Sequence, residues 1–177
     1  MDDRRIIDAP GVTIWQCAPV RTLILRIRNA PAARIRSLSF SLGVGEDMPG
    51  PNRAAGQNPR VAWLAPGEWM IRGTAGPTPD VASLAPDVTA HLADISDGRI
   101  CFAFKGEAVG DILSKASPLD FHPRVFGIDD CAQTLFAQTR VLIERVEADR
   151  PFLLHADISF ADHLKGWLAQ ASAEYLP

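Results

Sequence analysis

Residues 112–134 read ILSKASPLDFHPRVFGIDDCAQT, and this stretch is the most informative part of the chain. An apolar segment of helical character runs into a proline-bounded loop, and a strand then begins at Cys131. The loop carries Asp120, His122 and Arg124, three polar side chains in close succession. Taken alone, these residues suggest either a reactive thiol or a small polar site.

Composition places the chain among ordinary globular proteins. It has 177 residues, of which 47% are hydrophobic and 22% charged, with a formal net charge of −3. This charge offers no basic stripe, so a nucleic-acid partner is not expected. No apolar run approaches the roughly 20 residues of a membrane helix, and residues 1–5 lack the apolar core of a signal peptide. We therefore expect a cytoplasmic protein with no membrane partner.

The three cysteines, Cys17, Cys101 and Cys131, lie far apart in the sequence. None forms a CxxC pair, so a metal or iron–sulfur cage within this chain is not expected. An odd number of cysteines also argues against a disulfide framework and favours a reducing compartment.

The first half predicts a strand, a helix and a hairpin. Residues 21–28 alternate with a period of two, which predicts a strand with one buried face. Residues 32–42 have apolar side chains at helical spacing. A long loop over 43–60, with room for a short edge strand, precedes a hairpin over 61–71, whose turn is Pro66-Gly67.

A linker over 76–80 and a weak helix ending near Pro86 lead to a second half of similar order. Strands are predicted over 91–95, 99–105, 132–138, 141–146 and 152–156, and helices over 106–115 and 159–175. Ser159 is predicted to cap the last helix, and Phe160 to begin its apolar stripe. The acidic residues Glu144, Glu147 and Asp149 are interpreted as a solvated hairpin tip.

The fold class is therefore expected to be α+β. The chain is interpreted as a single domain over 1–177, with pseudo-halves at about 20–90 and 91–177. Each half forms a β-α-β-β-α unit, and the two units pack together with antiparallel sheet and with helices on the outside.

Three motifs follow one another along the chain. Residues 63–69 read WLAPGEW, residues 118–123 read PLDFHP and precede Val125-Phe126, and residues 131–134 read CAQT. In this order they resemble the gamma subunit family of heterotetrameric sarcosine oxidase, over roughly residues 23–175. The chain departs from the family pattern at 116–117, where the family often has Gly-Cys, and at 128–130, where it often has Pro-Gly-Arg.

The resemblance implies a fold related to the folate-binding domain of aminomethyltransferases, without a catalytic site in this chain. It implies a structural and assembly role in a cytoplasmic complex with alpha, beta and delta subunits. That complex oxidatively demethylates sarcosine and passes the one-carbon unit to tetrahydrofolate. FAD, FMN, NAD and tetrahydrofolate are expected on the partner subunits, and no cofactor or metal on this one. A homodimer of the isolated chain is left open.

Two other functions remain open. The chain could act alone as a folate-binding or one-carbon-transfer protein, by analogy of fold. Cys131 could be a nucleophile with His122 as base and Asp120 as orienter. We favour a buried structural cysteine, because the adjacent Asp129 and Asp130 disfavour a thiolate if they lie near it.

His122 is interpreted as a structural or interface histidine, because the other histidines show no ligand spacing towards it. Trp63 and Trp69 flank a tight turn, and core packing is weighed about evenly against anchoring a partner or stacking on a folate-like ring. The candidate residues for a partner interface or a structural motif are Trp63, Trp69, Asp120, His122, Arg124, Cys131, Gln133 and Thr134.

Overall fold

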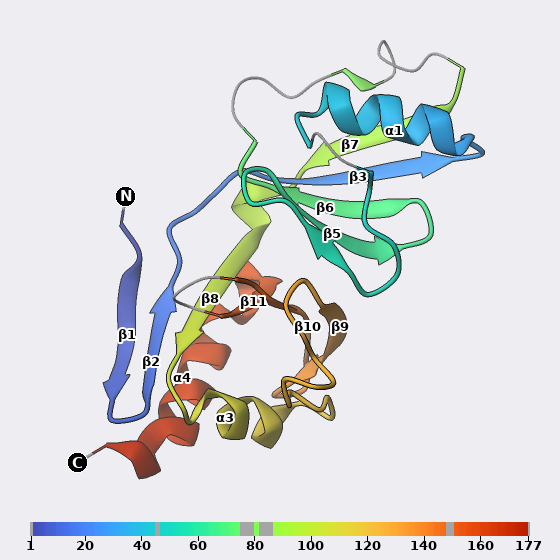
Figure 1. The fold of residues 1–177 in the computed structure, drawn as a ribbon. Coiled ribbons are helices and arrows are strands. Elements are labelled where there is room, and N and C mark those ends of the chain that lie inside the picture. The colour runs from blue at the N-terminus through green and yellow to red at the C-terminus, as the bar shows by residue number, and fades with distance from the viewer. Residues whose placement is uncertain (1, 45–46, 75–79, 82–86, 148–150, 177) are drawn as a thin grey trace. The chain divides into compact units, whose positions relative to one another are not determined.

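The computed structural model describes residues 2–44, 47–74, 80–81, 87–147 and 151–176. The chain divides into two compact units (Figure 1). We call Val20–Ser96 the central unit, and Met1–Pro19 with Asp97–Pro177 the terminal unit. Each unit has its own antiparallel sheet together with helix, so the expected α+β class is confirmed.

The central unit has a five-stranded sheet in the order β4-β5-β6-β3-β7. Its elements are β3 (Thr22–Arg28), α1 (Ala32–Ser41), β4 (Ala54–Ala55), β5 (Arg60–Ala65), β6 (Glu68–Arg72) and β7 (Thr89–Asp94). The short edge strand expected in the long loop is β4, which pairs with β5. The predicted linker over 76–80 and the weak helix ending near Pro86 lie largely outside the described residues.

Strand β3 shows why this unit folds as it does. The residues predicted for its buried face lie in the core, where they pack with Leu38 of α1: Leu23, Leu25 and Ile27. Thr22 and Ile24, which the alternation predicted to be exposed, are buried as well. On that face Arg26 and Arg28 are the exposed residues. Both edges of β3 are paired, because it lies between β6 and β7 in the sheet.

The tryptophan hairpin forms between β5 and β6 as predicted, with Ala65 opposite Glu68 and Trp63 opposite Trp69. Gly67 in its turn has a φ of +74°, and a Cβ there would lie 2.3 Å from the carbonyl oxygen of Ile27. A residue with a side chain could not take this conformation and approach without strain.

The terminal unit has a six-stranded sheet in the order β1-β2-β8-β11-β10-β9. Its strands are β1 (Arg4–Ala9), β2 (Val12–Gln16), β8 (Arg99–Lys105), β9 (Cys131–Phe136), β10 (Thr139–Arg145) and β11 (Phe152–Asp157). Its helices are α3 (Val109–Ala116) and α4 (Ala161–Ser172). The β1–β2 hairpin was not predicted, and it joins the second half of the chain because β2 pairs with β8.

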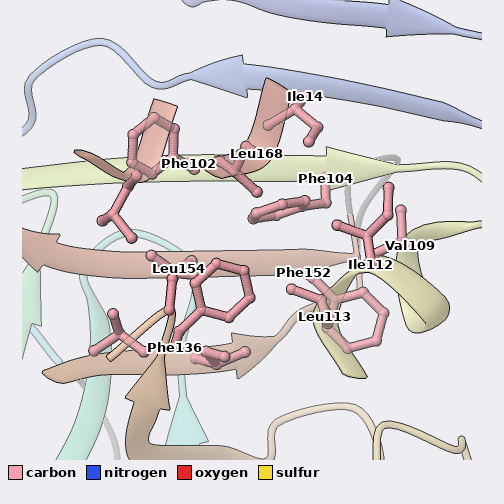
Figure 2. Packing of buried hydrophobic residues seen from close by; sticks show 14 of the residues in the cluster. Ile14, Phe102, Phe104, Val109, Ile112, Leu113, Phe136, Phe152, Leu154 and Leu168 are labelled. Carbon is pink, nitrogen blue, oxygen red and sulfur yellow. The ribbon is translucent and has the colours of Figure 1, made fainter. Parts of the chain in front are cut away.

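One face of this sheet packs against both helices (Figure 2). Val109, Ile112 and Leu113 are the buried residues of α3, as their spacing predicted. They meet a cluster from the sheet and from α4 that includes Ile14, Phe102, Phe104, Phe136, Phe152, Leu154 and Leu168. Aromatic side chains of this size supply a large share of the apolar area that stabilises a core.

The start of the last helix differs from the prediction. Asp157 accepts hydrogen bonds from the backbone N–H of Ser159 at 3.0 Å and from its hydroxyl at 2.7 Å. A 3₁₀ turn over Ile158–Phe160 therefore precedes α4. The prediction of Ser159 as cap was wrong because its hydroxyl donates to Asp157, and Phe160 is exposed rather than part of the apolar stripe.

Strand β7 belongs to the central unit and not to the second half of the chain. The sequence assigned it to the second half, beyond a boundary near residue 90. It pairs with β3 along its whole length, and the central unit therefore extends to Ser96.

Candidate functional site

The segment between α3 and β9, residues 117–130, contains the PLDFHP motif, and we call it the PLD loop. Ser117 ends α3 in an extended conformation, and Pro118 follows it. The buried Ser117 hydroxyl lies 3.3 Å from the Thr134 hydroxyl and 3.4 Å from the backbone nitrogen of Leu119, which donates to it. One small side chain thus connects the helix end, the loop and strand β9.

Polar side chains of the PLD loop bond to its own backbone. The Asp120 carboxylate accepts the His122 N–H at 2.8 Å, and His122 Nδ1 accepts the Arg124 N–H at 3.3 Å. The His122 carbonyl accepts the N–H groups of Val125 and Phe126 at 2.8 and 2.9 Å. Such short-range bonds are typical of Asx turns and fix the loop conformation.

Two phenylalanines anchor the loop to the terminal unit. Phe121 and Phe126 are buried and lie edge to face, with ring centroids 5.8 Å apart. Phe152 of β11 lies edge-on to the first ring at 6.0 Å and stacks on the second at 6.4 Å. The loop backbone is held between these side chains and the polar bonds.

Arg145, at the end of β10, braces the far end of the loop. Its Nη1 donates to the Phe126 carbonyl at 2.7 Å, and its guanidinium lies 5.4 Å from the Phe152 ring centroid. Its backbone pairs with both Asp129 and Asp130 at 2.9 Å. Arg145 was not among the candidate residues predicted from the sequence, although a cation two residues after the apolar run Val141–Ile143 was a signal for it.

The Cys131, His122 and Asp120 arrangement does not resemble a catalytic relay. Cys131 is buried, whereas the other two are exposed. Asp120 bonds to the backbone of His122 and not to its ring, while Nδ1 of that ring acts as an acceptor. A relay needs the acid to accept a hydrogen bond from an N–H of the imidazole ring, so this geometry favours a structural role.

The remaining candidates belong to two different units, Gln133 and Thr134 to the terminal unit and the two tryptophans to the central unit. Gln133 of β9 is exposed and Thr134 is half-buried against Ser117. In the central unit, Trp69 is buried and donates from Nε1 to the Pro49 carbonyl at 2.9 Å. Trp63 opposite it is half-buried against the same core, so both tryptophans contribute to packing.

A buried acid–histidine pair was also missed. Glu144 is 0% exposed and His155 5% exposed, and Oε1 of the acid lies 2.7 Å from Nε2 of the imidazole. The interpretation of Glu144 as part of a solvated tip was wrong, because β10 continues through it. In the sheet register Glu144 is opposite Cys131, and His155 is opposite Leu142 and Cys101.

Within the described ranges, no group of three or more His, Cys, Asp or Glu side chains is arranged to hold a metal ion. None of the helices in that part of the chain is both long and apolar enough to cross a membrane.

A solved structure has the same fold as this chain. The chain superimposes on a chain of the heterotetrameric sarcosine oxidase from Corynebacterium sp. U-96, in a complex with pyrrole 2-carboxylate, with a TM-score of 0.84 at 24% sequence identity. The superposition covers 98% of this chain and 89% of that one.

Sequence comparison points the same way. The chain is 29% identical to the sarcosine oxidase subunit gamma of Arthrobacter sp. over 158 residues, which is 84% of this chain and 75% of the relative. It is 31% identical to the subunit gamma of Corynebacterium sp. strain P-1 over 122 residues, 65% of this chain and 57% of the relative.

The fold is thus that of a small α+β chain similar to one chain of this heterotetrameric oxidase. The profile of the sarcosine oxidase, gamma subunit family matches residues 33–174, and the chain belongs to this family.

Proposed function

We propose that this protein is the non-catalytic gamma subunit of a cytoplasmic heterotetrameric sarcosine oxidase, in which the whole chain acts as one structural domain. The observation that carries the proposal is the family match over residues 33–174. The internally bonded PLD loop supports it, because its polar side chains hold backbone and do not form a catalytic relay.

In this proposal the chemistry belongs to alpha, beta and delta partner subunits. They would hold FAD, FMN and NAD, oxidatively demethylate sarcosine, and transfer the one-carbon unit to tetrahydrofolate. This chain would support their assembly. Trp63, Gln133 and the exposed residues of the PLD loop are the predicted contributors, whereas Trp69, Cys131 and Thr134 would maintain the fold.

The test is co-expression with the other three subunits. We expect the tagged chain to co-purify with them. Flavin absorbance should appear only in preparations that contain the partner subunits. The chain purified alone should bind no flavin. A tagged chain that never retains the partners would contradict the proposal.

Titration of the isolated chain with tetrahydrofolate separates this proposal from a stand-alone folate-binding function. We expect no heat of binding in calorimetry. Micromolar binding by the lone chain would favour the folate-binding function instead.

A further inference from the structure

The PLD loop exposes apolar side chains and, adjacent in the sequence, a cation. Val125 is 62% exposed and Ile128 46% exposed, and Pro123 and Arg124, which directly precede Val125, are exposed too. We call Pro123, Arg124, Val125 and Ile128 the loop patch. Single exposed apolar residues are common, but several on one short loop mark a candidate interaction surface.

The loop patch stands on a rigid base. Val125 precedes Phe126, whose ring is buried and whose carbonyl accepts from Arg145. Ile128 lies in the next turn, which Asp130 closes by accepting the Gly127 N–H at 2.6 Å. A preorganised surface loses little conformational entropy when it binds, so this bracing favours association.

The charge of the patch indicates the kind of partner. The Arg124 guanidinium forms no ion pair within the part of the chain that the structure describes. Arginine beside apolar side chains is a composition enriched at protein interfaces, and it pairs best with a carboxylate. A second copy bound through the same patch would bring another unpaired Arg124, whereas a different chain with an acidic group would neutralise it.

We propose that the loop patch is the docking surface for another subunit of the oxidase complex, whose facing surface is apolar and carries a carboxylate for Arg124. This inference rests on the proposed function and adds the surface through which the chain is held. It also gives the PLD loop a role: the inward side chains hold its shape and the outward ones bind.

The experiment compares tagged variants of the full chain, co-expressed with the other three subunits. Val125→Asp combined with Ile128→Asp, and separately Arg124→Glu, should each lower the yield of co-purified partners about tenfold or more. Phe40→Asp is the matched control, because Phe40 is 58% exposed on α1 in the other unit. It should leave the yield unchanged, and thermal unfolding of each lone variant should match the wild type within a few degrees.

The outcomes separate the two proposals. Normal assembly of wild type and of all variants would overturn the loop patch as interface and leave the proposed function intact. Failure of the wild type to assemble would overturn both. If sedimentation shows a dimer of the lone chain that the patch variants abolish while they still assemble normally, the patch binds a second copy and the inference is wrong.

Discussion

Replacing Glu144 by Leu should be among the most destabilising single changes in this chain. The carboxylate is fully buried and 2.7 Å from the His155 imidazole, which is itself 5% exposed. Removing one member leaves a buried polar group without this partner. Such a loss costs about 3–5 kcal/mol when the pair is ionic and about 1–3 kcal/mol when it is a neutral hydrogen bond.

The double variant Glu144→Leu, His155→Leu should recover much of that loss. Replacing both members of a buried pair by apolar side chains of similar volume is often neutral or stabilising. The pair should therefore show a coupling energy of about 2–3 kcal/mol in a double-mutant cycle.

The measurement is urea unfolding followed by circular dichroism, with thermal unfolding as a second readout. For a chain of this size about 1 kcal/mol shifts Tm by roughly 2–4 °C, so Glu144→Leu should lower Tm by about 6–20 °C if the pair is ionic. Glu147→Leu is the control: Glu147 is exposed, and the change should stay within about 0.5 kcal/mol. A loss under about 1 kcal/mol for Glu144→Leu, or strict additivity in the cycle, would refute the reasoning.

Four other changes test separate parts of the structure. Arg145→Gln should destabilise by about 1–3 kcal/mol and speed proteolysis within the PLD loop; unchanged cleavage would show that the loop does not need this brace. Cys131→Ser should leave the activity of the assembled complex unchanged, since we place the thiol outside the chemistry, and a large loss of turnover would contradict that role. Gly106→Ala should cost more than about 1 kcal/mol, because Gly106 has a φ of +126° and a Cβ there would lie 2.1 Å from the Gly11 carbonyl oxygen; an unchanged unfolding midpoint would argue against this close approach. Hydrogen bonds from Ser159, first from its hydroxyl and second from its backbone N–H, lower the pKa of Asp157. The stabilisation from this carboxylate is therefore present above its unfolded pKa and is lost as the pH falls through the folded pKa. Asp157→Asn should make stability depend less on pH in the acid range, and an unchanged dependence would count against the bonds between Asp157 and Ser159.

Local sequence patterns were sufficient to predict an element wherever a chain segment determines its own conformation. The alternation in Arg99–Lys105 predicted β8 to the residue. The helical spacing of Val109, Ile112 and Leu113 identified the buried face of α3, and Pro66-Gly67 located the hairpin turn. Periodicity and turn chemistry act over a few residues, so they can be read without knowing the neighbours.

The sequence by itself therefore determined the α+β class, most elements and the family motifs. Only the tertiary structure decided that Glu144 is buried beside His155, that Arg145 braces the PLD loop, and that β1 and β2 join the sheet of the second half. These features depend on which strands become neighbours and in which register. Pairing between distant segments is selected by the packing of the whole sheet, which no local pattern of side chains specifies.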